Sequence, residues 1–249
     1  MKKLIVCAFF ALGTVAFAQS NNDVTLQVGV DNSAIVDQDG LQNDNLIVQL
    51  GLSNHAETTQ EGWANENVTL SVGAFNEAYV DQEGWWNENS TTQLGLGNVA
   101  YVDQLGVGNM NEQMQIGNGN YAETTQVGFF NSTVQYQEGD MNSATSEQDG
   151  SLNEVDQYQE GTLNVAYASQ TGDLNDIIQY QNGVGNDAYA LQMGDGNLID
   201  QWQVGNGNSA TDIQLGNDNY SYITQSGDTH THLGVQLGNG NSMIVTQTN

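Results

Sequence analysis

The 249-residue sequence contains no proline, a single cysteine and only two basic residues, Lys2 and Lys3. Without proline, every backbone N–H remains available for hydrogen bonding along a sheet. Because Cys7 is the only cysteine, disulfide bonds cannot stabilise the chain that follows it. The 30 acidic residues are balanced by no Lys or Arg beyond residue 3, which excludes the basic surface of a nucleic-acid-binding protein.

The N-terminal segment 1–18 has the pattern of a secretory signal peptide. Two lysines precede an apolar run that ends in Ala16-Phe17-Ala18, so cleavage is expected between Ala18 and Gln19. The run is too short to span a membrane stably, and no later segment is long enough either. We therefore expect a secreted protein without membrane insertion. Cys7 comes before the apolar run rather than after it, which argues against a lipoprotein.

From about residue 21 the chain repeats with a period of eleven, without an insertion or a deletion. Glutamine recurs from Gln27 to Gln247, with Ser71 as the one substitute. Glycine follows two residues later, from Gly29 to Gly238, and asparagine three residues after that, from Asn32 to Asn241, with His230 as its one substitute. High charge with low hydrophobicity is typical of disorder, but a strict period indicates a repeat protein.

The full repeating unit is twice as long, with a period of 22, because alternate units differ. Seven residues after the glutamine, alternate units carry alanine, from Ala34 to Ala210, whereas the others carry Asn45 and its varied counterparts. Stacking residue i on residue i+22 therefore places residues of the same type directly above one another. Identical amides stacked in this way can bond to one another one rung away, which satisfies buried polar groups. This favours β-arcs, in which two strands face each other across a core, over hairpins.

Each unit has about eight residues that can be extended, such as 98–105, and three that turn, such as 106–108. Alternation in a strand places the asparagine, the alanine-type position and the glutamine on one face, which we expect to be interior. The variable face should be exposed to solvent. The expected core amide ladder comprises Asn32, Gln38, Asn54, Gln60, Asn76, Gln82, Asn98, Gln104, Asn120, Gln126, Asn142, Gln148, Asn164, Gln170, Asn186, Gln192, Asn208 and Gln214.

Glycine tolerates positive φ, and asparagine does so more than most residues. The repeat therefore supplies turn residues at every corner. The expected turn glycines include Gly29, Gly40, Gly51, Gly62, Gly73, Gly84, Gly95, Gly106, Gly117 and Gly128.

These patterns predict an all-β fold for residues 19–249. The expected architecture is a flat, two-sided parallel β-solenoid of stacked 22-residue strand–arc–strand repeats. About 21 strands would form about ten and a half turns, roughly 50 Å tall at about 4.8 Å per rung.

The pattern Q-x-G-x-x-N-x-A-x-x-x-Q resembles the curlin repeat of curli, the secreted amyloid fibres of bacterial biofilms. The resemblance extends over essentially all of residues 21–249. It implies a structural subunit that is exported through a dedicated pore, nucleated on the cell surface by a nucleator subunit, and used in biofilm matrix and adhesion. The chain departs from the familiar pattern in its length and its lack of basic residues, and the second departure favours a major subunit over a nucleator.

The residues themselves also favour a fibre. The repeat frame runs from Asn21 to Gln247, and an unpaired terminal rung is a template for another chain. We therefore expect end-to-end stacking into amyloid-like fibres. Acidic residues such as Asp39, Glu61 and Glu83 should form columns, in which neighbours repel by about 1 kcal/mol in water unless salt or acid relieves them. The same carboxylates would also keep the secreted chain soluble.

An alternative function is that of a monomeric β-solenoid that binds ice, a glycan or another extended ligand at a surface. Such a protein needs a flat, regular outer face, for example repeated Thr-x-Thr. Here Thr58, Thr69, Thr91 and Thr124 are expected on the inner face, and the outer face is irregular. The fibre is therefore the preferred interpretation.

Two histidines near the C-terminal end form the only candidate ion site. His230 and His232 occupy interior positions, one turn after the acidic Asp212 on the same face. They would form a small ion or metal site, a pH-sensitive rung or, most simply, a degenerate last repeat. The Asp- and Asn-rich corners 194–197 and 216–219 are better explained by turn chemistry than by calcium binding.

Exposed aromatic residues are expected to serve general adhesion, because their placement along the sequence is scattered. They are Trp63, Trp85, Trp86, Phe129, Phe130, Tyr180 and Trp202. The sequence has no Ser/His/Asp or Cys/His constellation, and its carboxylates recur with the repeat rather than as a catalytic pair. We therefore expect no enzyme, no cofactor and no metal site beyond the candidate formed by His230, His232 and Asp212.

Overall fold

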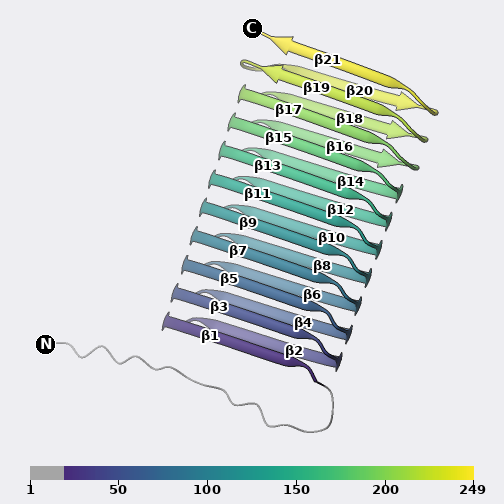
Figure 1. Ribbon diagram of the computed structural model, residues 1–249. Coiled ribbons are helices and arrows are strands. Elements are labelled where there is room, and N and C mark those ends of the chain that lie inside the picture. Colours follow the sequence, from purple (N-terminus) through teal and green to yellow (C-terminus); the bar gives the residue numbers. More distant parts are fainter. Residues whose placement is uncertain (1–19) are drawn as a thin grey trace, which may run out of the picture.

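The computed structural model describes residues 20–249 as a stack of parallel strands, with β1 and β21 at opposite ends (Figure 1). Odd-numbered strands form an 11-stranded sheet and even-numbered strands a 10-stranded sheet. The predicted all-β solenoid of stacked 22-residue repeats is confirmed. The predicted signal peptide 1–18, with Cys7, lies outside the described residues.

The strands are short and nearly uniform in length. Most have nine residues, whereas β16, β18, β19, β20 and β21 have seven. Their bounds are β1 Asn22–Val30, β2 Ser33–Leu41, β3 Asp44–Leu52, β4 His55–Trp63, β5 Glu66–Ala74, β6 Glu77–Trp85, β7 Glu88–Leu96, β8 Val99–Val107, β9 Met110–Asn118, β10 Tyr121–Phe129, β11 Ser132–Asp140, β12 Ser143–Ser151, β13 Glu154–Thr162, β14 Val165–Asp173, β15 Asp176–Val184, β16 Asp187–Met193, β17 Leu198–Asn206, β18 Ser209–Leu215, β19 Tyr220–Ser226, β20 Thr231–Leu237 and β21 Ser242–Thr248. Residues 20–249 form no helix, and hence none that is long and apolar enough to cross a membrane.

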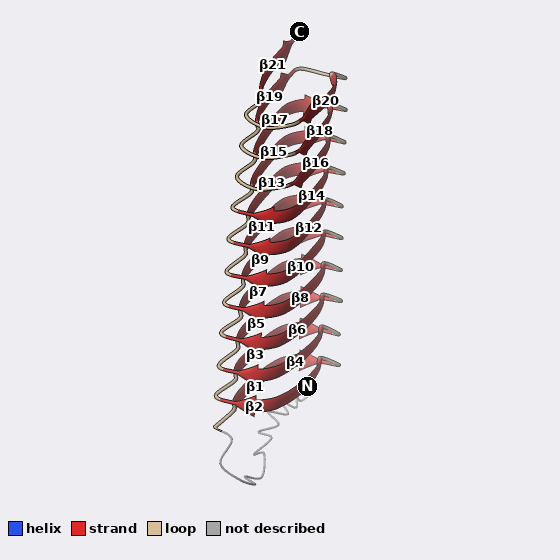
Figure 2. Cartoon of the chain, turned by 90° about the vertical axis from the view of Figure 1, so that its right-hand side faces the viewer, coloured by secondary structure: helices blue, strands red, loops and turns tan. Residues whose placement is uncertain are grey.

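Each interior strand pairs in parallel with the strands two before and two after it in the chain, and the edge strands β1, β2, β20 and β21 pair on one side only. In β6 and β8, Ala78 pairs with Ala100 and Gln82 with Gln104, which is the predicted register of i with i+22. Consecutive strands such as β6 and β7 lie in opposite sheets that face each other (Figure 2). The connections are therefore β-arcs rather than hairpins.

The glycines predicted to form the turns lie inside strands instead. Gly106 is the eighth residue of β8, with φ of 136°, and the bend follows at Gly108, with φ of 67°. The predicted turn glycines from Gly29 to Gly128 all have this strand-end geometry. Thirteen bends carry a residue other than glycine at positive φ, among them Trp86 and Phe130. The expected eight-residue strand is too short because the ladder continues through the glycine.

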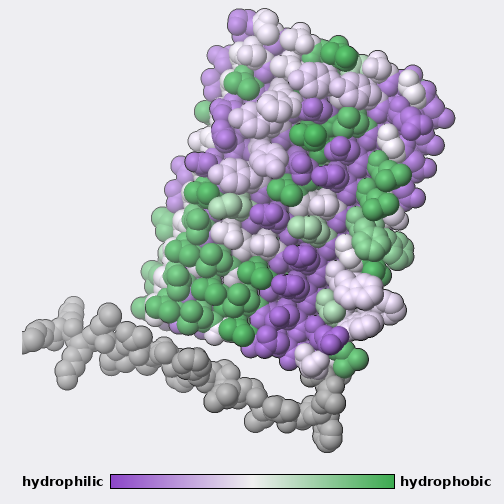
Figure 3. All heavy atoms as spheres, in the orientation of Figure 1, coloured by the Kyte–Doolittle hydropathy of each residue, from purple (hydrophilic) through white to green (hydrophobic). Residues whose placement is uncertain are grey.

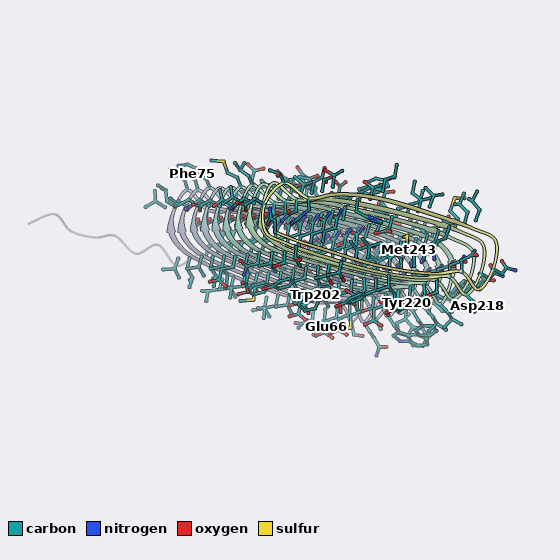
Figure 4. The ribbon with its side chains drawn as sticks, turned by 90° about the horizontal axis from the view of Figure 1, so that it is seen from above. Glu66, Phe75, Trp202, Asp218, Tyr220 and Met243 are labelled. Atoms are coloured by element: carbon teal, nitrogen blue, oxygen red, sulfur yellow. The ribbon has the colours of Figure 1, made fainter. Side chains whose placement is uncertain are left out.

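The two sheets enclose a narrow interior that is half amide. In β8, Ala100, Val102 and Gln104 are buried, whereas Tyr101 and Asp103 are exposed. Viewed along the stack, the chain traces a flattened ring from which outer side chains project (Figure 4). The aliphatic part of the interior is small and includes a cluster of Val155, Ala168, Ile177, Ala190 and Ile199.

Candidate assembly surface

Columns of glutamine run up the interior from both sheets. In the even sheet, each Nε2 donates to the Oε1 of the glutamine one rung on, from Gln38 to Gln236, at 2.7–3.1 Å. The same amides cross to the opposite sheet, as when Gln104 Nε2 donates to Glu88 O at 2.9 Å. The odd column is interrupted at Ser71, whose hydroxyl donates to Gln93 at 3.1 Å. The columns thus satisfy buried amides both along and across the stack.

Asparagine columns stand where the strands begin. Asn76 Oδ1 accepts hydrogen bonds from the backbone N of Asn98 at 3.0 Å and from its Nδ2 at 3.2 Å. Asn98 Nδ2 also donates to Gly117 O, one rung further on, at 3.0 Å. Each asparagine therefore ties three rungs together. His230, the substitute in this column, keeps the backbone bond to Asn208 Oδ1 at 3.0 Å.

The structure places every residue of the expected amide ladder in these columns. All are buried except Asn32 and Gln38, which are half-buried beside the edge strand β2. Sequence reasoning missed a further column, Gln113, Gln135, Gln157, Gln179 and Gln201, whose amides bond at 2.9 Å. The recurring Gln-x-Gln in alternate units was the signal that could have revealed it.

Asp212 is a fully buried carboxylate at the end of that further column. Its Oδ2 accepts a hydrogen bond from Gln201 Nε2 at 2.7 Å, and its Oδ1 accepts one from Ser221 Oγ at 3.0 Å. His232 Nε2 lies 3.3 Å from Oδ1. Gly234 leaves room for this arrangement, because a Cβ there would crowd both Asp212 and His232.

The predicted ion site is therefore only partly assembled. His232 meets Asp212, but the ring of His230 lies elsewhere, with Nε2 3.1 Å from Ser226 O. Across residues 20–249, no three His, Cys, Asp or Glu side chains gather closely enough to hold a metal ion. The pair is built into the solenoid core near its C-terminal end rather than arising from a frayed repeat.

The strand-end glycines form a column of their own at each edge. A Cβ on Gly128 would overlap the carbonyl oxygen of Gly150 in the next rung. Glycine is therefore required by the close approach of stacked backbones, in addition to its positive φ. At the bend the situation differs, since a Cβ on Gly185 would meet nothing within 4 Å.

Acidic side chains stack on the outer face of the even sheet, in the predicted columns. Asp39 pairs with Glu61 and Glu61 with Glu83, and Asp81 pairs with Asp103. Burial raises the pKa of Asp81, and the neighbouring carboxylates, Asp103 first, raise it further. Asp103 is exposed, but partial burial of its carboxyl group and the charge of Glu83 likewise raise the pKa of Asp103.

A second acidic group lies on the outer face of the odd sheet. Burial, followed by the charges of Glu154, Asp156 and Asp200, raises the pKa of Asp176 to about 6. The pKa values of Asp156 and Asp200 are also raised, in each case chiefly by burial. Acid therefore relieves charge repulsion on both outer faces.

The aromatic residues are less scattered than the sequence suggested. Trp63, Trp85 and Trp86 gather at one arc, with ring centroids 5.6–6.4 Å apart, because Trp63 and Trp85 share one register position and Trp86 follows Trp85. On the odd sheet, the rings of Tyr180 and Trp202 contact each other at a tilt, with centroids 4.8 Å apart. The expectation of scattered placement was wrong, since it considered spacing along the chain rather than along the stack.

Aliphatic side chains form patches at opposite ends of the two outer faces. On the odd sheet they cover the first strands, visible as the green area low in Figure 3, and include the exposed Val24, Leu26, Val28, Val30, Leu46 and Leu52. On the even sheet they cover the last strand, with Leu233, Val235 and Leu237 between 52% and 70% exposed.

The Asp- and Asn-rich corners bond to backbone. Asp195 Oδ1 accepts a hydrogen bond from Asp173 N at 3.0 Å, and Asn217 Oδ1 accepts one from Asp195 N at 3.0 Å. These contacts suit the turn chemistry expected of the corners. The inner-face threonines also lie as expected, since Thr58, Thr69, Thr91 and Thr124 are buried.

The edge strands carry the donors and acceptors of the interior rungs. Gln27 and Gln38 each donate to the next rung, and no glutamine among residues 20–249 donates to their Oε1 atoms. At the other end, Gln236 and Gln247 accept from the rung below. One end of the stack thus lacks the glutamine donors that the other end can offer.

Residues 117–150 and 150–178 match the family model of the curlin associated repeat. Residues 117–178 carry curlin repeats. The curlin repeats that match span the middle of the stack, and the frame on either side of them is the same. The curlin repeat family is structural rather than enzymatic. A search of curated proteins finds no match to this chain.

Proposed function

We propose that the protein is a structural subunit of secreted, curli-like amyloid fibres that elongate by end-to-end stacking of β-solenoids. The observation that carries this proposal is the match between the two edges of the stack. Every interior rung is held by parallel backbone pairing and by amide columns, and the edge strands present the same groups without a partner rung. Stacking another copy would repeat contacts that the protein already makes.

The biological setting follows from this proposal and from the curlin repeats. Residues 1–18 act as a signal peptide, and the mature chain begins at Gln19. The fibre lies at the cell surface, in biofilm matrix and adhesion, and is supplied by a curli-type export pore and a nucleator subunit. The chain itself is the major subunit. Mass spectrometry of the secreted protein tests the first step, since a mature N-terminus other than Gln19 contradicts the predicted cleavage.

The rival function, a monomeric ligand-binding solenoid, lacks the regular outer face that it needs. Outer residues of the even sheet change from Glu57 and Glu61 in β4 to Leu233 and Leu237 in β20. The threonines that recur lie inside. Only the inner face is regular, and that face is exposed at the two ends of the stack.

Fibre diffraction and particle size over time test the proposal. Mature protein should grow from monomers into fibres that give a meridional reflection at about 4.7–4.8 Å. A matched control carries Val245→Pro and Thr246→Pro in β21. Successive N–H groups of a strand point to opposite neighbours, so one of the two prolines removes a donor from the open edge. The control should elongate far more slowly. A wild-type protein that stays monomeric would contradict the proposal.

A further inference from the structure

We propose that successive subunits in the fibre exchange sheets, so that the odd sheet of one copy continues the even sheet of the copy below. This inference rests on the proposed function, because it specifies how the second copy docks. Three observations carry it: the number of strands, the side chains at the two edges, and the aliphatic residues on their outer faces.

The number of strands in the described stack is odd. Consecutive strands alternate between the sheets, and the last strand, β21, belongs to the odd sheet. In a solenoid each strand lies half a rung above the one before it, so the next free position is over β20, in the even sheet. An incoming β1 fills that position and β2 then lies over β21. Placing β1 over β21 instead would leave one strand missing between β20 and β2.

The edge side chains fit the exchanged arrangement. With β1 over β20, and the repeat frame kept, Gln27 lies over Gln236 and Asp23 over His232. Asp23 replaces the asparagine of its column, and its Oδ1 accepts a hydrogen bond from Asn45 Nδ2 at 2.7 Å. A carboxylate has no proton to donate, so the group beneath it must be a donor. The imidazole of His232 can supply one, and it replaces the alanine of its own column, which Ala210 represents one rung below.

The unexchanged arrangement fits these residues poorly. With β1 over β21, Asp23 would lie over Met243, whose thioether donates no hydrogen bond. Met243 lies inside the ring (Figure 4), where its Cε fills the space left by Gly234. A carboxylate buried against it would lose hydration without a compensating partner. In the exchanged arrangement Met243 meets Ala34 instead, and Val245 meets Val36.

The outer faces also match across the exchanged junction. Leu233 lies beneath Val24, Val235 beneath Leu26, and Leu237 beneath Val28. These six side chains are 47–70% exposed in the single copy, and stacking them removes apolar surface from water. The unexchanged junction would instead set Leu26 on Thr246 and Val28 on Thr248. The two aliphatic patches, at opposite ends of opposite faces, thereby become one continuous band.

Disulfide trapping distinguishes the two junctions, because the chain from Gln19 has no cysteine of its own. Adjacent strands lie about 4.8 Å apart, within the Cα separation that a disulfide spans. The mature double variant Leu26→Cys/Val235→Cys should give fibres that, after oxidation, dissolve into ladders of linked subunits. The control Leu26→Cys/Thr246→Cys should dissolve into monomers. Linked control subunits, or fibres of both variants that yield no links, would overturn the exchange. Failure of the wild type to form fibres contradicts the proposed function instead.

A second measurement avoids engineered cysteines. Asp23→Asn keeps an acceptor for Asn45 but removes the second carboxylate oxygen and the charge that face His232. Elongation on wild-type seeds should slow about tenfold, as expected for a lost hydrogen bond to a charged group. Asp37→Asn, an outer-face variant of β2, removes the same charge and should not slow elongation. If Asp23→Asn instead elongates as fast as Asp37→Asn or faster, Asp23 faces no donor and the exchange is refuted.

Discussion

Gln126 and Val127 are neighbours in β10, yet their surroundings follow different rules. Gln126 is buried, and its amide bonds to glutamines one rung below and one rung above at 2.9 Å. Val127 is exposed and stacks on Leu105 below and Asp149 above. The inner face repeats from rung to rung, whereas the outer face changes. The inner face therefore fixes the register of the stack, and the outer face is free to vary in charge and hydrophobicity.

The largest effect is expected from a change in the column of strand-end glycines, where the backbones of successive rungs lie closest together. Gly128→Ala would drive a Cβ into the carbonyl oxygen of Gly150, at a cost of about 3 kcal/mol or more in the free energy of unfolding. The control Gly185→Ala lies at a bend where a Cβ meets nothing and should cost only about 1–2 kcal/mol. Chemical denaturation of monomer measures both. Equal losses would show that positive φ, rather than close stacking, requires the glycines.

Gln126→Leu tests the amide column against its outer neighbour. It leaves the amide of Gln104 without its column acceptor, which should lower the free energy of unfolding by about 1–3 kcal/mol. Val127→Ser, on the exposed side of the same strand, should change it by less than about 0.5 kcal/mol. The same denaturation experiment compares them. Similar losses at both positions would remove the distinction between the two faces.

Asp176→Asn tests the outer face through pH. The pKa of Asp176 is raised to about 6, so its folded form binds a proton more tightly than its unfolded form. Protonated Asp176 therefore adds to the free energy of unfolding at low pH, and this contribution is lost as the pH rises from about 4 through about 6. At pH 7 the variant should have a free energy of unfolding higher by up to about 1 kcal/mol, because it lacks the unfavourable charge. Contact with solvent limits the size of this gain. The stability of the variant should also depend less on pH. Ile178→Val, two residues along β15, should leave the pH dependence in place. An unchanged pH profile in Asp176→Asn would show that the acidic neighbours do not act on it.

The smallest expected effect concerns the charge columns and the rate of assembly. Wild-type protein should assemble more slowly at neutral pH and low salt than at pH 4 or in high salt. Glu61→Gln removes the middle charge of the column with Asp39 and Glu83 and should speed assembly about twofold to fivefold at low salt. The control Glu112→Gln removes a charge that stacks on Ser90 and Val134. Rates that respond equally to both variants would show that net charge, rather than stacking, controls assembly.

The sequence predicts the inner face well and the outer face poorly. The period of 22 was enough to predict that Ala78 meets Ala100, since a parallel stack has one register that sets like on like. It did not predict that Gly106 lies inside a strand, because the cause is the carbonyl of Gly128 in another rung. The tryptophan cluster was missed for a similar reason, since Trp63 and Trp86 come from successive turns of the stack. The same period placed Asp212 and His232 on one inner face, one turn apart, but it did not predict that the ring of His230 lies away from them, against Ser226 O.

The odd number of strands determines whether the two broad sides of the fibre are alike. If each subunit exchanges sheets with the next, the filament has two equivalent broad sides, related by a half-turn and a translation. Neither side is a front or a back, and both display the aliphatic band once per pair of subunits. Removing or adding a single strand-and-bend unit would make the strand number even, and the same chemistry would then produce a ribbon with two different broad sides, one built from odd sheets alone and the other from even sheets alone.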